Sequence, residues 1–280
     1  MKKELIAASV LAALTVPAVA ADGTDAILRL RDERKKHPEI ISVEFPGSTK
    51  WREAYDAIYS HGAIIENPYL ALRIYMNESQ AVDVYLKQKP GLECRNTAFY
   101  STPDAVAAGQ GTDVLKVGKS IGAGSFRGFD GKDAVDIADV ESRGQAVTND
   151  STVTVTDRGW LYNGHRIDVC ERYTAHANSA VIDVEILLRG VKEGDIFCTG
   201  VQKLETDNRG GFALPSTAYS SGKNAPDGKK PELVEAVALC VECDPANLAG
   251  TVETGLNYLL LLKPDKDGYI RYTITASRPQ

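Results

Sequence analysis

Alternating apolar and polar positions run through much of the chain and predict a mainly β protein. The clearest alternations cover residues 152–162, 165–175, 180–189 and 269–276, and side chains that alternate in this way fit half-buried strands. Shorter strands are predicted at residues 40–45, 70–76, 81–87, 234–241 and 258–263. Asn163-Gly164 separates Tyr162 from His165, and this dipeptide is typical of a two-residue type I′ turn. It therefore predicts an antiparallel hairpin.

Only one segment carries a helical pattern. Residues 24–36 mix Ala26, Leu28 and Leu30 with charged residues and end before Pro38, which predicts a short amphipathic helix. Residues 51–60 are ambiguous between helix and loop. Long strands, antiparallel turns and few helices predict an all-β fold, a large antiparallel β-sandwich with a short N-terminal helix. No repeat or linker divides residues 21–280, so we expect one domain.

The N-terminus has the pattern of a secretory signal peptide. Lys2 and Lys3 precede an apolar run over residues 5–16, and the small residues Ala18 and Ala20 flank Val19. This arrangement predicts a signal at residues 1–20, cleaved after Ala20. The apolar run is too short to cross a bilayer comfortably. We therefore expect a periplasmic or secreted protein without membrane attachment after cleavage.

Charge and cysteine content narrow the function classes. The net charge is -6, and no basic run is long enough to form a nucleic-acid-binding face. The five cysteines are an odd number, so at least one is unpaired within the chain. Cys240-x-x-Cys243 lacks a second cysteine pair or a nearby histidine pair, and we predict no metal and no cofactor. The sequence indicates no particular oligomeric state.

The most informative stretch is the pair of strands at residues 70–87. One face of the pair is apolar, and the other carries Arg73, Tyr75, Asp83, Tyr85 and Lys87. If a three-residue loop, 78–80, joins the strands, Tyr75 faces Asp83 and Arg73 faces Tyr85. His61 and Glu66 lie just upstream. A solvated outer face would also alternate, but two tyrosines beside an arginine favour a functional face.

Three segments resemble a known family. They are HGAIIENPYLALRIYMNESQAVDVYLK, TAFYSTPDAVAAGQGTDVLKVGKSIGAGSFRGFDGK and WLYNGHRIDVCERYTAHANSAVIDVEI, and they resemble exported bacterial proteins of domain-of-unknown-function family 4861. That family is similar to galactose-mutarotase-like supersandwiches, whose broad concave sheet forms a carbohydrate site. It tends to occur in bacteria that degrade uronate-rich polysaccharides. The resemblance therefore implies a supersandwich fold and a carbohydrate substrate.

The resemblance can be carried over position by position. The matching motif residues here are His61, Gly62, Glu66, Arg73, Tyr75, Asp83, Tyr85, Lys87, Arg127, Gly128 and Arg172. The chain departs from the family pattern at Lys116, where an aromatic residue is frequent, and at Phe129, where tryptophan is frequent. These two departures affect the far rim of the implied carbohydrate cleft more than they affect the strand pair at residues 70–87.

Several chemistries fit these residues. For β-elimination on a uronate, Arg73 or Arg127 would neutralise the carboxylate, His61 would be the base, and Tyr75 or Tyr85 the acid. Lys87 would lower the pKa of a nearby tyrosine.

The alternatives use other groups of the same set. Hydrolysis would use Glu66 and Asp83, and a mutarotase or epimerase would pair a histidine with a carboxylate. A non-catalytic glycan-binding module would use aromatic platforms such as Trp160 and Tyr162. The candidate catalytic residues are His61, Glu66, Arg73, Tyr75, Asp83 and Tyr85, and the candidate substrate-binding residues are Lys87, Arg127, Arg172 and Trp160.

Overall fold

The computed structural model describes residues 23–96, 99–224 and 234–279. The predicted signal peptide at 1–20 lies outside these residues. The strands are β1 Asp25–Ile27, β2 Ser42–Pro46, β3 Gly62–Glu66, β4 Leu70–Tyr75, β5 Val82–Leu86, β6 Thr112–Asp113, β7 Arg127–Phe129, β8 Ala134–Val135, β9 Ser142–Asn149, β10 Thr152–Tyr162, β11 His165–Ala175, β12 Val181–Arg189, β13 Phe197–Gln202, β14 Thr206–Leu214, β15 Thr217–Lys223, β16 Val237–Cys243, β17 Leu248–Glu253, β18 Asn257–Leu262 and β19 Tyr269–Ser277. The helical elements are α1 Trp51–Ala57, α2 Pro103–Ala107 and the 3₁₀ turns η1 Tyr59–His61 and η3 Pro245–Asn247.

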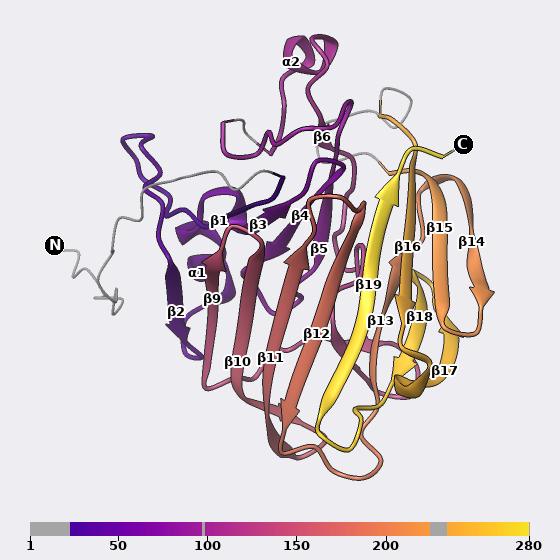
Figure 1. The fold of residues 1–280 in the computed structure, drawn as a ribbon. Helices are drawn as coiled ribbons and strands as arrows, with labels where there is room; N and C mark the ends of the chain where they lie inside the picture. The colour runs from indigo at the N-terminus through magenta and orange to yellow at the C-terminus, as the bar shows by residue number, and fades with distance from the viewer. Residues whose placement is uncertain (1–22, 97–98, 225–233, 280) are drawn as a thin grey trace, which may run out of the picture.

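These strands form three antiparallel sheets, which confirms the all-β sandwich. The large sheet has nine strands in the order β14-β15-β16-β19-β12-β11-β10-β9-β2. Two five-stranded sheets, β1-β3-β4-β5-β6 and β17-β18-β13-β7-β8, lie behind it in Figure 1. Apolar side chains from all three sheets meet in one main core, for example Leu72 of β4, Val184 of β12 and Leu260 of β18.

The long strands follow the sequence pattern closely. Along β11, Ile167, Val169 and Tyr173 are buried while Arg166 and Asp168 are exposed, so alternate residues face the core and the solvent. Strands β10 and β11 begin and end where the alternation predicts. Asn163 and Gly164 between them have φ values of 48° and 77°. Both central residues thus adopt the left-handed conformation that a type I′ turn requires, which confirms the hairpin.

The predicted N-terminal helix at residues 24–36 is wrong. Residues 25–27 form β1, which pairs with β3, and Arg29 then pairs with Glu39 in an isolated bridge. The apolar residues Ala26, Ile27 and Leu28 are consecutive and all buried. A strand that is covered on both faces can bury such a run, whereas a surface helix buries one stripe. The helix near the N-terminus is instead α1, in the segment that the pattern leaves ambiguous.

The strand pair β4–β5 has the two faces that the sequence predicts, but in a different register. Arg73 pairs with Asp83, and Ala71 pairs with Tyr85. The predicted pairing of Arg73 with Tyr85 is therefore shifted by two residues. The connecting loop is longer than assumed because Asn77 and Gln80 close a turn of their own, with the Gln80 amide donating to the Asn77 carbonyl at 3.2 Å. The side chain of Gln80 is buried and donates to Asp157 of β10, which anchors the turn.

The cysteines of the described residues are all thiols: Cys94, Cys170, Cys198, Cys240 and Cys243. Cys243 is buried and Cys240 is half-buried in β16, and their odd spacing places them on opposite faces of the strand. They therefore cannot bind one metal ion together. Among residues 23–96, 99–224 and 234–279, no helix is long and apolar enough to cross a membrane.

Candidate functional site

The polar face of β4 and β5 is covered rather than open to solvent. Residues 88–96 and 99–111, here called the covering segment, lie over it, and their side chains Cys94 and Phe99 pack with Ala71 and Tyr85. Arg73, Asp83 and Tyr85 each have no exposed surface. This face therefore forms a buried layer of ionic and aromatic contacts.

Arg73 is the centre of this layer. Its Nη2 donates to Asp83, to Asp113 of β6 at 3.2 Å and to the Tyr75 hydroxyl at 2.5 Å. Its guanidinium carbon lies 4.1 Å from the ring centre of Phe99 and 4.8 Å from that of Tyr100. Nε and Nη1 of Arg73 have no hydrogen-bond acceptor among the described residues, so aromatic faces take the place of acceptors on that side.

The carboxyls and the phenol around Arg73 have shifted pKa values. Burial, and then the negative charge of Asp83, raise the pKa of Asp113 well above its usual value. Burial and Asp83 also raise the pKa of Tyr75, against the effect of Arg73. Tyr75 therefore keeps its proton, which it donates to Asp83 Oδ2 at 2.8 Å. At neutral pH Tyr75 is therefore a hydrogen-bond donor, and it can give up its proton only where Arg73 stabilises the phenolate that forms.

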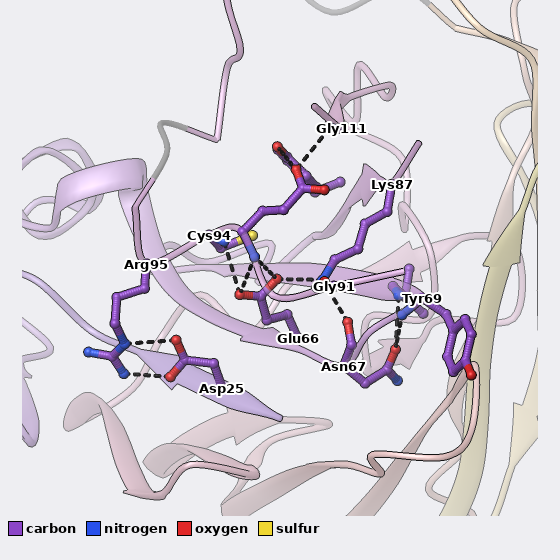
Figure 2. Close-up of polar contacts among 12 residues, drawn as sticks. Asp25, Glu66, Asn67, Tyr69, Lys87, Gly91, Cys94, Arg95 and Gly111 are labelled. Carbon is purple, nitrogen blue, oxygen red and sulfur yellow. Dashed lines mark hydrogen bonds and ion pairs between the residues drawn. The ribbon is translucent and has the colours of Figure 1, made fainter. Parts of the chain in front are cut away.

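A second buried group, centred on Glu66 and Lys87, attaches the covering segment to the sheet (Figure 2). Lys87 Nζ lies 2.6 Å from Glu66 Oε2 and donates to the carbonyls of Asn67 and Gly91. Glu66 also accepts the backbone amides of residues 93 and 94 at 2.9–3.1 Å. Because both charged groups are fully occupied, their role is to hold the covering segment in place.

Tyr85 also holds the covering segment in place. Its hydroxyl donates to Glu93 Oε2 at 2.8 Å and lies 3.3 Å from Ser101 Oγ. Lys87 is committed to Glu66, so the sequence expectation that it lowers the pKa of a catalytic tyrosine lacks a structural basis.

His61 lies at the edge of the buried layer and is partly exposed, with a side-chain exposure of 20%. It ends η1 with a φ of 66°, directly after Ser60 with a φ of 60°. Two consecutive non-glycine residues in the left-handed region store strain, which persists only where the surroundings hold it. Here the His61 ring stacks on Tyr55 of α1, with ring centres 3.9 Å apart, and its Nδ1 lies 3.2 Å from the Tyr55 carbonyl oxygen.

The environment of His61 favours a neutral imidazole. Burial lowers its pKa most, and the charges of Arg31 and Arg73 lower it further, while the Tyr55 carbonyl and Asp56 oppose them. With the proton on Nδ1, where the Tyr55 carbonyl accepts it, the lone pair is on Nε2. Arg31 Nη2 lies over the ring, 3.1 Å from Nδ1 and 3.4 Å from Nε2.

Around His61, side chains from several elements form a partly exposed group that we call the rim site: Arg31, Tyr55, His61, Tyr75 and Tyr100. Tyr55 contacts Tyr75 with ring centres 5.5 Å apart, and Tyr100 is 47% exposed. The rim site is thus the accessible border of the buried layer around Arg73. It contains an imidazole, three phenols and a guanidinium.

The remaining sequence candidates lie elsewhere. Arg127 is buried and donates to the carbonyls of Ser79 and Ser120. Trp160 is 1% exposed and stacks on Tyr162 within the core. Arg172 lies on the outer face of the large sheet, 58% exposed and 3.3 Å from Glu185. The structure thus brings His61, Arg73, Tyr75 and Asp83 together. Arg127, Trp160 and Arg172 lie away from that group.

Sequence reasoning missed Arg31, Tyr55, Tyr100 and Asp113. Arg31 fell within the wrongly predicted helix, and Asp113 within a glycine-rich stretch without a strand pattern. Tyr55 had a usable signal, because it follows Trp51 by four residues, which places both aromatics on one face of a helix.

A protein-family model matches nearly the whole chain. The family model described as "Domain of unknown function (DUF4861)" matches residues 13–278. No curated protein matches the chain. The matched range includes all three sheets, the covering segment and the rim site.

Proposed function

The chain belongs to the DUF4861 family, and we propose that this member is an exported enzyme that cleaves uronate-containing saccharides by β-elimination at the rim site. The observation that carries the proposal is that Tyr55 contacts both His61 and Tyr75, with ring centres 3.9 and 5.5 Å away. A neutral imidazole and a phenol that keeps its proton therefore lie around one aromatic ring. Environments that make one group a base and its neighbour an acid are typical of acid–base catalysis.

Each step of the elimination has a group to perform it. Nε2 of His61 takes the proton from the carbon next to the carboxylate, and the electrons of that C–H bond form the new C=C bond. The bond from the neighbouring carbon to the glycosidic oxygen breaks, and Tyr75 protonates that oxygen. Arg73, 2.5 Å from the Tyr75 hydroxyl, stabilises the phenolate that results. Solvent protons then restore Tyr75, and His61 releases its proton.

Arg31 supplies the positive charge that makes the proton acidic. It is exposed, and its Nη2 lies against the His61 ring. A uronate carboxylate is a stronger partner for a guanidinium than an imidazole nitrogen is. Substrate binding would therefore draw Arg31 away from the His61 ring and leave the base free. Arg73 is buried under aromatic rings, so we assign it to positioning Tyr75.

The hydrolytic alternative has less support. It needs two carboxyls on either side of the scissile bond, but Glu66 is occupied by Lys87 and two backbone amides. A binding module without chemistry is the second candidate, favoured by the exposed aromatics Trp51 and Tyr100, at 44% and 47% exposure.

The test is incubation of the purified protein with polyuronates, followed by absorbance near ~230 nm, where a C=C bond conjugated to a carboxylate absorbs. We expect His61→Gln and Tyr75→Phe each to lower the rate about 100-fold or more, while circular dichroism shows that each variant is still folded. Tyr69→Phe is the matched control, because Tyr69 is a 45% exposed tyrosine outside the rim site. New reducing ends without absorbance would indicate hydrolysis and contradict the proposal. Binding of a polyuronate without any product would favour the non-catalytic binding module.

A further inference from the structure

A hollow of about 470 Å³ lies beside the rim site, and its lining includes Arg29, Lys35, Lys36, His37, Glu39, Tyr59 and Arg95. Its lining holds four cationic side chains against one carboxylate, Glu39. The whole chain has a net charge of -6, so this local excess of positive charge runs against the average of the molecule. Such a surface attracts anions.

The cations of the hollow differ in how far they are neutralised. Arg29 and Arg95 both pair with Glu39, at 2.9 and 2.5 Å, and Arg95 also pairs with Asp25 at 2.5 Å (Figure 2). Lys35 and Lys36 are exposed and have no acidic partner among residues 23–96, 99–224 and 234–279. The two arginines are thus held in place by carboxylates, and the two lysines are free to bind.

The floor of the hollow suits a sugar. The His37 ring stacks on Tyr59, with ring centres 3.8 Å apart and planes 16° apart. The Asp32 amide donates to His37 Nδ1 at 3.3 Å and so helps to hold the ring in place. A flat aromatic pair next to cations can contact both the ring and the charged substituents of a saccharide.

The hollow and the rim site are neighbours. Tyr59 of the hollow and His61 of the rim site belong to the same turn, η1. Arg29 and Arg31 flank Leu30, which packs against the main core, so these two arginines point to the opposite side in an extended segment. One loop, residues 29–39, thus supplies a guanidinium to each location.

We propose that this hollow is a subsite for the anionic substituent of a further sugar, either a carboxylate or a sulfate ester, on a chain whose two sugars on either side of the cleaved bond occupy the rim site. The anion subsite itself rests on the residues of the hollow. Only the statement about the rim site rests on the proposed function. Lys35 and Lys36 bind the anion, and His37 and Tyr59 support the sugar ring. The enzyme therefore prefers charged saccharides longer than a disaccharide.

The experiment compares the full chain with the double variant Lys35→Gln/Lys36→Gln. The control is Lys132→Gln/Lys266→Gln, which removes two exposed lysines far along the chain from the hollow. Calorimetry measures binding to polygalacturonate, digalacturonate, chondroitin, chondroitin sulfate and neutral dextran. We expect the double variant to bind the long acidic chains about fivefold to tenfold more weakly and with a weaker dependence on salt. Digalacturonate binding and the control variant should be unchanged.

The outcomes separate the two proposals. Weaker binding of chondroitin sulfate alone assigns the hollow to sulfate esters, and weaker binding of chondroitin as well assigns it to carboxylates. Unchanged binding of every acidic polymer overturns the subsite, even if His61→Gln abolishes turnover. Lysine-dependent binding without any product overturns the proposed elimination and keeps the anion site. Where a substrate is turned over, the subsite predicts a raised KM and an unchanged kcat.

Discussion

The ring of His61 lies parallel to that of Tyr55, with the ring centres 3.9 Å apart and an angle of 9° between the planes. The backbone carbonyl oxygen of the same tyrosine lies 3.2 Å from Nδ1. One residue of α1 therefore fixes the orientation of the imidazole and offers an acceptor for a proton on Nδ1. This explains how a strained left-handed residue stays in place at the end of η1.

The neighbours of His61 should move its pKa in opposite directions. Arg31 lowers this pKa and Asp56, 3.8 Å from Nδ1, raises it. Arg31→Gln should therefore raise the pKa of His61, and Asp56→Asn should lower it further. Proton NMR of the imidazole measures both values. If the enzyme is active, the acidic limb of its pH–rate profile should move the same way, because the base works only when neutral. Equal pKa values in the two variants would contradict the assignment.

Replacement of each of the two carboxyls beside Arg73 should lower the free energy of unfolding by a different amount. Burial and the charge of Asp83 raise the pKa of Asp113 and so disfavour its charged form, and Asp113→Asn should change the free energy of unfolding by less than about 1 kcal/mol. Asp83 accepts from both Arg73 and Tyr75. Asp83→Asn should cost about 2 kcal/mol or more, because it leaves a buried cation poorly balanced. Urea unfolding at neutral pH compares the two, and the reverse order would show that Asp113 carries the charge.

Removal of Lys87 should release the covering segment. Lys87→Met leaves the carboxylate of Glu66 buried without its cation, and such a loss typically costs about 3–5 kcal/mol. Limited proteolysis should then cut within residues 88–111 before it cuts the large sheet. Lys89→Met is the control, since Lys89 is exposed, and should stay within about 0.5 kcal/mol of the parent protein. Equal stability of the two variants would mean that the covering segment is held by other contacts.

Glu171 should make the fold less stable as pH rises. It is buried between the sheets, burial raises its pKa to about 8, and Tyr173 donates to it at 2.7 Å. In the unfolded chain its pKa returns to the usual 4.5. The folded state therefore holds a proton that the unfolded state releases, and stability falls by roughly 1.4 kcal/mol per pH unit between these two values.

Glu171→Gln should remove that slope. The variant should gain stability relative to the parent at about pH 9 and not at about pH 4, as measured by urea unfolding at both. A parallel pH dependence of the two proteins would show that Glu171 is ionised within the fold.

The sequence predicts the large sheet better than the site. Strands β10 and β11 have one face in the core and one in solvent, so their alternation determines their ends and their pairing. Strand β3 and residues 25–28 were missed because they are buried on both faces and show no alternation. The register of β4 and β5 depended on a loop whose length is set by Gln80 reaching Asp157, a contact far apart in sequence.

The same difference between local pattern and long-range contact explains which residues of the site could be predicted. His61, Arg73, Tyr75 and Asp83 lie on or beside one strand pair, so local periodicity brings them together. Arg31, Tyr100 and Asp113 reach them from three other segments, and no local pattern encodes that approach. The polar face of β4 and β5, which the sequence predicts to bind sugar, is buried because the covering segment lies over it. The likeness to a supersandwich carbohydrate site stays a prediction.

The last strand of the large sheet has a consequence for biosynthesis. β19, residues 269–277, lies between β12 and β16 in the middle of the sheet rather than at its edge. While a ribosome is still making the preceding residues, β12 and β16 each have an open edge, and the two parts of the sheet cannot join. Folding must therefore be completed after translation of residue 277, which leaves a long interval in which a chaperone can still handle an incompletely folded chain.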